Sequence, residues 1–203
     1  MLALLSNYCF SAVLVSAQTL EHADGQQAAH CRLDILGLQN GRLHRAGMNC
    51  TGVNTLTVAL NSTYLRRFET NCTGINLATS CPSEVTEGAP YSCLVTICKG
   101  TVVLLDSRVS WVRGNPLNGL LCVLHNSSVE VYNSRFMNNQ VRPLVVGGQA
   151  RMLLHASNVL RNAFNGSGAG LWVEGNASVT ISGGSRLQGI TAREIGGGLS
   201  AVG

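Results

Sequence analysis

The sequence predicts an all-β protein folded as a right-handed parallel β-helix, a solenoid with units of about 23–27 residues. The first observation behind this prediction is internal repetition. Segments 121–139, 144–162 and 171–189 share one pattern when written in register, segment 94–112 precedes them, and Leu199 opens a further unit. Self-similarity at a fixed period of this size indicates a stack in which each unit buries its apolar face against its neighbours.

The second observation is the alternation of apolar residues inside each unit. The matching columns include Val129/Val131, Met152/Leu154 and Val179/Ile181. A spacing of two residues is typical of strands. A unit of this length has no room for a crossover helix, so strands of successive units are expected to pair in parallel about 4.8 Å apart. Leucine-rich repeats are the competing solenoid, but their L-x-x-L-x-L-x-x-N run is missing.

Short motifs in the second half of the chain resemble those of a known family. Phe136–Asn139 has the form F-x-x-N, Val159–Asn162 is its aligned variant, and Gly168–Leu171 and Gly196–Leu199 are loose forms of G-G-A-[ILV]. Over residues 94–203 these motifs resemble the polymorphic outer membrane proteins of chlamydiae and related secreted, pectin-lyase-like β-helix proteins. The resemblance implies a secreted or surface-exposed adhesin. It also implies a right-handed helix, which agrees with the general preference for right-handed crossovers.

The asparagines and glycines of these motifs also have a physical interpretation. An asparagine at the end of one unit can pair its side-chain amide with the asparagine of the next unit. Glycine lets the chain turn with a positive φ. We therefore expect stacked asparagines and left-handed turns at the ends of the strands.

Three parts are expected along the chain. Residues 1–17 are mostly apolar and end in small residues, which predicts a secretory signal peptide, with an uncleaved anchor as the alternative. Residues 18–93 are expected to form an irregular, disulfide-containing cap and the first coils, in which Arg32–Leu38 alternates like an opening strand. Residues 94–203 carry the regular repeats, and we expect this part to be truncated because the unit at Leu199 has only begun.

Eight cysteines agree with export into an oxidising compartment. Their spacings fit neither a zinc ribbon nor a C-x-x-C redox motif, so disulfides are the expected role. Cys9 would leave with the signal peptide, and the remaining candidates are Cys31, Cys50, Cys72, Cys81, Cys93, Cys98 and Cys122. Because seven is odd, either one thiol is free or intermolecular, or the chain is incomplete. The pairing is left open.

Six N-x-[ST] sequons are glycosylation candidates if the source is a eukaryote. They begin at Asn49, Asn61, Asn71, Asn126, Asn165 and Asn176. In a bacterium they would carry no such meaning. We expect most of them to be exposed, because turns on the surface favour Asn, Ser and Gly.

One column of apolar residues is expected to point away from the core. Its members are Val95, Cys122, Val145 and Trp172, which lie between the inward residues of each unit's first strand. A sheet that faces water normally carries polar residues there, so this column indicates a covered surface. Either a loop of the same chain packs over it, or it is a docking face for another protein or for a glycan ring stacked on Trp172.

A second candidate for binding is basic. Arg108 and Arg135 occupy one column a unit apart, in a chain with 13 Arg, one Lys and a net charge of +4. Stacked guanidinium groups stay charged and repel each other unless an anion lies across them. The pair is therefore either a solvated surface or a site for an acidic glycan.

No catalytic, metal or cofactor site is expected. After residue 100 the carboxylates are Asp106, Glu130, Glu174 and Glu194, and they fall in different columns. A glycosidase needs two carboxyl groups about 5–10 Å apart. The histidines lack metal-ligand spacing, and no nucleophile elbow, phosphate loop or dinucleotide fingerprint is present.

These observations predict a secreted or cell-surface interaction and adhesion module without catalytic activity. The expected partner is a protein or glycan at the cell surface, with no nucleic acid and with membrane contact only through an anchor outside this chain. Two alternatives stay open. One is the non-catalytic part of a polysaccharide-active β-helix enzyme whose catalytic rungs are absent, and the other is a structural component of the extracellular matrix.

Overall fold

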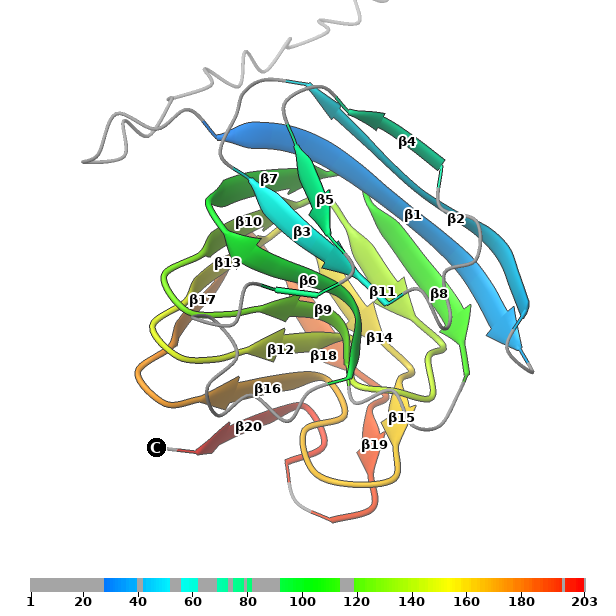
Figure 1. Cartoon of the computed structure of the whole chain (residues 1–203). Helices are drawn as coiled ribbons and strands as arrows, with labels where there is room; N and C mark the ends of the chain where they lie inside the picture. Colours follow the sequence, from blue (N-terminus) through cyan, green and yellow to red (C-terminus); the bar gives the residue numbers. More distant parts are fainter. Residues whose placement is uncertain are drawn as a thin grey trace, which may run out of the picture.

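The computed structural model describes residues 28–39, 42–51, 56–61, 69–72, 75–78, 80–81, 92–113, 119–194 and 196–202. Within these residues the backbone forms strands and turns, and no helix occurs. The strands belong to an 11-stranded, a 7-stranded and a 2-stranded sheet. The predicted all-β parallel β-helix is confirmed (Figure 1). The predicted signal peptide, residues 1–17, lies outside the described residues.

Each coil of the regular part contributes three main strands. The first strand joins the 7-stranded sheet, and the next two join the two halves of the 11-stranded sheet. The four coils are β6 (Cys93–Lys99), β7 (Thr101–Leu105) and β8 (Arg108–Val112); β9 (Gly119–Val123), β10 (Ser128–Tyr132) and β11 (Arg135–Met137); β12 (Leu144–Val146), β13 (Arg151–His155) and β14 (Asn158–Leu160); and β16 (Leu171–Glu174), β17 (Ser178–Ser182) and β18 (Arg186–Gln188). Three further strands are β15 (Ala163–Phe164), which pairs with β19 (Thr191–Ala192), and β20 (Leu199–Val202), which begins another coil.

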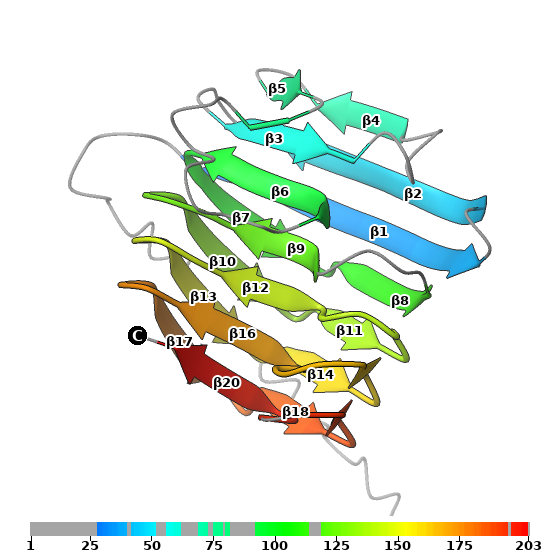
Figure 2. The ribbon, with the colours of Figure 1, turned by 60° about the horizontal axis from the view of Figure 1, so that its bottom comes forward.

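Successive coils lie in register. The predicted column of Val129, Met152 and Val179 is confirmed by direct parallel pairing. The first strands of the coils form a second column, Leu121–Leu144–Leu171–Leu199. The handedness can be followed in Figure 2. For an observer who looks along the stack from β6 toward β20, the chain turns clockwise as it recedes, so the helix is right-handed.

The inward columns form one continuous hydrophobic core. Val129, Val131 and Phe136 are fully buried in it, and Val179 packs against it at the last described coil. Burying an aliphatic or aromatic side chain of this size contributes about 1.5–3 kcal/mol. The stacked apolar columns are therefore a main source of the fold's stability.

The strand β6 departs from the expected register by one residue. The repeat pattern places Leu94 opposite Leu121, whereas the structure pairs Val95 with Leu121 and Thr96 with Cys122. Val95 is fully buried in the main core, so the prediction that it points outward is wrong. The sequence separation between paired residues is one residue smaller for β6 and β9 than for β7 and β10. The connection between β6 and β7 accounts for the difference.

The N-terminal strands cap the helix by reversing the chain. β1 (Ala29–Gln39) pairs with both β7 and β8 and so joins the two halves of the 11-stranded sheet. β2 (Arg42–Thr51) then runs antiparallel to β1, and β3 (Thr57–Leu60) runs antiparallel to β6. β4 (Glu69–Cys72) and β5 (Asn76–Ala78) pair in parallel with β2 and β3 at the far end of the stack (Figure 2). The strand predicted at Arg32–Leu38 lies within β1.

Left-handed residues bend the chain at the corners of each coil. A residue with a Cβ pays roughly 1–2 kcal/mol for this conformation. At the corner between the two halves of the 11-stranded sheet the residues with positive φ are Asp106, Asn133, Ala156, Gly183 and Gly184. At the corner after the second half they are Gly37, Trp111, Asn138, Arg161 and Gly189. Because the bends recur at the same place, successive coils keep the same outline.

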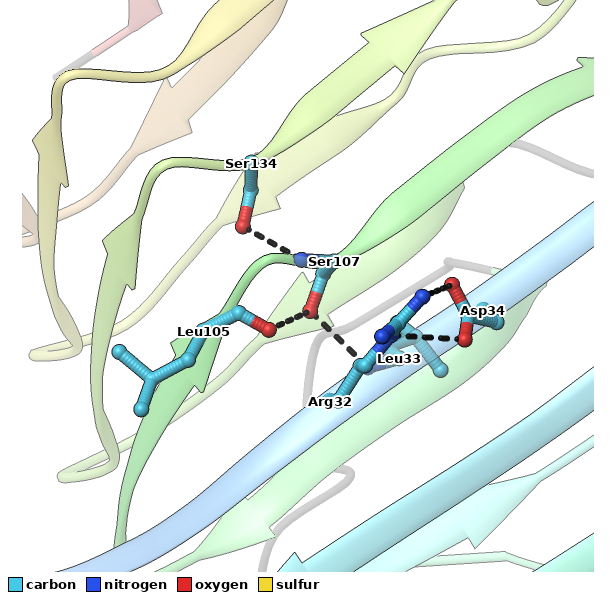
Figure 3. Close-up of polar contacts among 6 residues, drawn as sticks. All are labelled: Arg32, Leu33, Asp34, Leu105, Ser107 and Ser134. Atoms are coloured by element: carbon cyan, nitrogen blue, oxygen red, sulfur yellow. Dashed lines mark hydrogen bonds and ion pairs between the residues drawn. The ribbon is translucent and has the colours of Figure 1, made fainter.

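Buried serines cross the first of these corners as a ladder. The Ser134 Oγ accepts the backbone N–H of Ser107 at 3.0 Å and donates to the carbonyl oxygen of Tyr132 at 2.8 Å. The Ser107 Oγ accepts the N–H of Leu33 at 2.9 Å, and the Ser157 Oγ accepts the N–H of Ser134 at 3.0 Å (Figure 3). Each hydroxyl therefore replaces a backbone acceptor that the bend takes out of the β ladder.

Asparagines stack at the second corner, as their motif predicts. The Asn139 Nδ2 donates to the Asn162 Oδ1 at 2.9 Å, and both residues are buried. The Asn139 Oδ1 accepts the N–H of Val112, and the Asn162 Oδ1 accepts the N–H of Asn139, each at 3.0 Å. The F-x-x-N motif thus supplies a core residue, a left-handed residue and a ladder residue.

Disulfides bind the N-terminal part together, as expected for a protein of an oxidising compartment. Among the described cysteines, Cys72 carries the one free thiol, which accounts for the odd number. Burial raises the pKa of this thiol. The three bonded pairs are Cys31–Cys50, Cys81–Cys98 and Cys93–Cys122.

Replacing Ser134 with alanine should destabilise the protein, because the buried N–H of Ser107 loses its acceptor. We expect the free energy of unfolding, measured by chemical denaturation, to fall by about 1–3 kcal/mol. Ser178→Ala is the control, since that side chain is exposed and its loss should cost less than about 0.5 kcal/mol. Equal losses in the two variants would contradict a structural role for the serine ladder.

Peptide mapping without reduction should recover the three bonded pairs and leave Cys72 open to alkylation. Because burial raises the pKa of the Cys72 thiol, its thiolate is scarcer at neutral pH than that of a free cysteine, whose pKa is about 8.5. The midpoint of the increase in the rate of reaction with iodoacetamide should therefore lie above that value. A rate that levels off below it, or a different set of pairs, would show that the cap is arranged otherwise.

Candidate binding surfaces

The outward column of the 7-stranded sheet is largely covered. Cys122, Val145 and Trp172 occupy one column on β9, β12 and β16, as predicted. Cys122 and Val145 are 0% exposed, and with Cys93 and Leu124 they form a second hydrophobic cluster apart from the main core. Trp172 is half-buried and packs against this cluster. The Cys93–Cys122 disulfide links β6 and β9 within it.

Arg142 joins the connections between coils to this cluster. Its guanidinium lies 4.4 Å from the centroid of a Trp172 ring and 4.5 Å from that of Phe164. Its Nε donates to the carbonyl oxygen of Ser167 at 2.7 Å. A guanidinium stacked between aromatic rings gains cation–π attraction while its planar edge stays free to donate hydrogen bonds. The connections before β12 and β16 are therefore held against the outward side of the sheet.

These contacts decide how much of the outward column can meet a partner. Val145 and Cys122 lie in the interior, enclosed by other parts of the same chain. Trp172 keeps partial exposure, and its Nε1 donates to Glu174 at 3.2 Å. The sequence left two interpretations of this column. For Val145 and Cys122 the first one holds, because the chain covers these apolar residues itself.

The arginine column is present and extends further than the pair predicted from the repeats. Arg108 on β8 pairs with Arg135 on β11, and the column continues through Asn158 on β14 to Arg186 on β18. The three arginine side chains are exposed. With strands about 4.8 Å apart, Arg108 and Arg186 are separated by roughly 14 Å along the helix axis. We call the outward surface of β8, β11, β14 and β18 the arginine face.

The arginine face has a single sign of charge. Its four strands contain three arginines and no Asp or Glu, and the exposed Arg161 directly follows β14. Asp34 on β1 precedes Arg108 in the column, and it forms an ion pair with Arg32 of its own strand, with 2.9 Å between Nε and Oδ2. Guanidinium groups held this close repel one another, and an anion lying across them relieves that repulsion.

Two of the carboxylates after residue 100 accept a hydrogen bond from a hydroxyl group. Glu130 accepts a hydrogen bond from the Tyr132 hydroxyl at 2.9 Å, and Glu194 accepts one from Ser167 at 3.0 Å. Burial and the neighbouring Glu130 raise the pKa of Tyr132, so its hydroxyl stays protonated and can donate to a higher pH than that of an ordinary tyrosine. Among the described residues, no group of three or more His, Cys, Asp or Glu side chains is placed to hold a metal ion.

None of the sequon asparagines lies on the four strands of the arginine face. Asn61 is half-buried and donates to the Ser92 Oγ at 3.2 Å. Asn49 and Asn71 are register neighbours on β2 and β4. The exposed asparagines are Asn49, Asn71, Asn126, Asn165 and Asn176.

Some residues of these surfaces escape prediction from the sequence. Asn158 interrupts the arginine column, and Arg186 lies one residue later than the repeat predicts, because the corner between β17 and β18 has three residues where that between β13 and β14 has two. Trp111 lies near the end of β8, where the chain turns the corner, with φ 60° and 48% exposure. Arg142 lies in a connection, where the repeat pattern carries no signal for its position against Trp172.

Comparison of the chain with protein-family models, curated proteins and solved structures finds no match. No known protein therefore indicates the role of these surfaces. In the described part of the chain, no helix has the length and apolar character needed to cross a membrane.

Replacing Val145 with threonine tests whether the outward column is interior. The two side chains have similar shapes, so the change mainly buries a hydroxyl group, and we expect a loss of about 1–3 kcal/mol in the free energy of unfolding. Val202→Thr is the matched control in the same sheet, because Val202 is 49% exposed and the same change there should cost less than about 0.5 kcal/mol. Similar small losses in both variants, measured by chemical denaturation, would mean that Val145 is accessible to water.

Proposed function

We propose that the chain is an extracellular interaction module, secreted or held at a cell surface, that binds an acidic polysaccharide on its arginine face without altering it. The observation that carries this proposal is the column of Arg108, Arg135 and Arg186, exposed on strands that contain no carboxylate. A solvated surface normally mixes charges of both signs, whereas a surface of one sign attracts a ligand of the other.

The spacing of the column suits an extended anion with a repeating charge. Each guanidinium offers five N–H donors in a planar fork that can bind the oxygens of an anionic group through two bonds. The arginines stand on rigid strands along the axis of the helix, so one polymer lying along that axis can meet several of them at once. Such multivalent contact strengthens binding beyond that of any single ion pair. A small anion would gain the contact of one or two arginines only.

The location outside the cell is supported by three features. Three disulfides are typical of proteins that fold in an oxidising compartment. Five sequon asparagines are exposed and lie off the arginine face. The F-x-x-N motif resembles that of secreted adhesins, and this analogy favours adhesion over catalysis.

Binding to dextran sulfate, with unsubstituted dextran as the neutral control, tests the proposed function. The disulfide-bonded protein should bind the sulfated polymer and not the neutral one, with an affinity that falls as salt is added. The double variant Arg108→Gln, Arg135→Gln should bind about tenfold more weakly, because two contacts are lost from the column. A parallel titration with alginate distinguishes sulfate from carboxylate recognition.

The matched control is the double variant Arg151→Gln, Arg193→Gln, which removes the same charge from exposed arginines outside the arginine face. We expect it to lose less than about threefold in affinity, since only the long-range attraction is reduced. Equal losses in the two double variants would show that binding follows net charge and not this surface. Shortening of the polymer during incubation, measured by size-exclusion chromatography, would favour the alternative of a polysaccharide-active enzyme.

A further inference from the structure

Trp111 lies beside the arginine face, and its backbone has a conformation that is unfavourable for tryptophan. Its φ of 60° is left-handed, and a bulky residue in that region is a genuine outlier. At the same corner the other coils have Gly37, Asn138 and Gly189, which accept a positive φ more easily, and also Arg161. The fold therefore has no conformational reason to place a tryptophan here.

Burial does not offset this strain. Trp111 is 48% exposed, so about half of a large apolar surface remains in water. The guanidinium of Arg113 lies 5.9 Å from the centroid of its ring, which adds a further cation beside the indole. An outlier of this kind, together with an exposed aromatic side chain, points to a role in binding.

The surroundings of Trp111 match one kind of ligand. Arg108 precedes it by three residues on β8, roughly 10 Å along the strand. The outward residue between these two positions is Ser110, and its column continues on the neighbouring strands as the partly exposed Met137 and Leu160. A surface with an aromatic ring, a weakly apolar floor and a row of cations matches a sugar ring that carries an anionic group. The apolar face of the ring can lie on the indole while its charge reaches an arginine.

We propose that Trp111 is the stacking platform for a sugar ring of the acidic polysaccharide. This inference rests on the proposed function and deepens it, because the arginines alone attract any polyanion. Trp111 adds a preference for a polyanion built from sugars. The strained conformation at the end of β8 places the indole at the edge of the arginine face, on the same strand as Arg108.

The variant Trp111→Asn separates binding from folding, because asparagine stands at the same position in the next coil. We expect its free energy of unfolding to be equal to or higher than that of the wild type, and its affinity for dextran sulfate to be about fivefold to tenfold lower. Trp111→Phe keeps a ring and should stay within about threefold of the wild type. Poly-glutamate has charge but no sugar, so its affinity should change less than about twofold between wild type and Trp111→Asn.

Three outcomes would overturn the inference. Unchanged affinity of Trp111→Asn for dextran sulfate would show that the indole does not contact the polymer. A parallel loss for poly-glutamate would show that the effect is not specific to sugars. A clear loss of folding stability would assign Trp111 to the structure of the corner. If the wild type binds no polyanion, or if the change of Arg108 and Arg135 has no effect, the proposed function itself fails, which is a distinct result.

Discussion

Every coil of this protein must repeat the outline of the coil before it, because the main-chain hydrogen bonds of a parallel β-helix run between coils. A backbone group has a partner only where the next coil follows the same path. This single constraint explains why the left-handed residues recur at equivalent corners. It also explains the buried serines and asparagines, whose side chains replace the backbone partners lost at each bend. The apolar columns follow from the same repetition, since a residue that faces inward in one coil faces inward in the next.

The inward columns can be predicted from the sequence because alternation and period are direct consequences of this backbone. Val129, Met152 and Val179 pair as their positions in the repeat indicate. The F-x-x-N motif is equally informative, since Phe136 fills the core and Asn139 enters the ladder. Each of these residues is determined by local geometry that every coil repeats.

Other features depend on where the chain goes and not on its local pattern. A strand that reverses has the same alternation as one that continues, so the antiparallel pairing of β1 with β2 leaves no mark in the sequence. The one-residue shift that turns Val95 inward arises in the short connection between β6 and β7, where the alternation of apolar and polar residues gives no information. The partner of Cys31 is likewise set by a reversed strand, since Cys31 and Cys50 lie directly opposite each other on β1 and β2.

The lengths of the connections determine which outward surface stays open. The corner between β10 and β11 has two residues and cannot cover anything, so the outward side of β11 and its neighbours remains accessible. The connection between β11 and β12 is longer and carries Arg142, which lies against Trp172 on the outer side of the 7-stranded sheet. The apolar outward column is therefore covered by the chain itself. The arginine column, which borders the same long connection through β11, stays exposed and is matched by solvent or by another molecule.

The arginine face contains two local costs that the fold does not require. Repulsion between Arg108 and Arg135 would fall if either were asparagine, as Asn158 is in the same column. The strain at Trp111 would fall in the same way, as Asn138 shows at the equivalent corner. Both substitutes already occur one coil away, in the same backbone environment, so the geometry of the helix accepts them. Because the two costs meet on one open surface and nothing in the core depends on them, the ligand proposed for this surface would account for both.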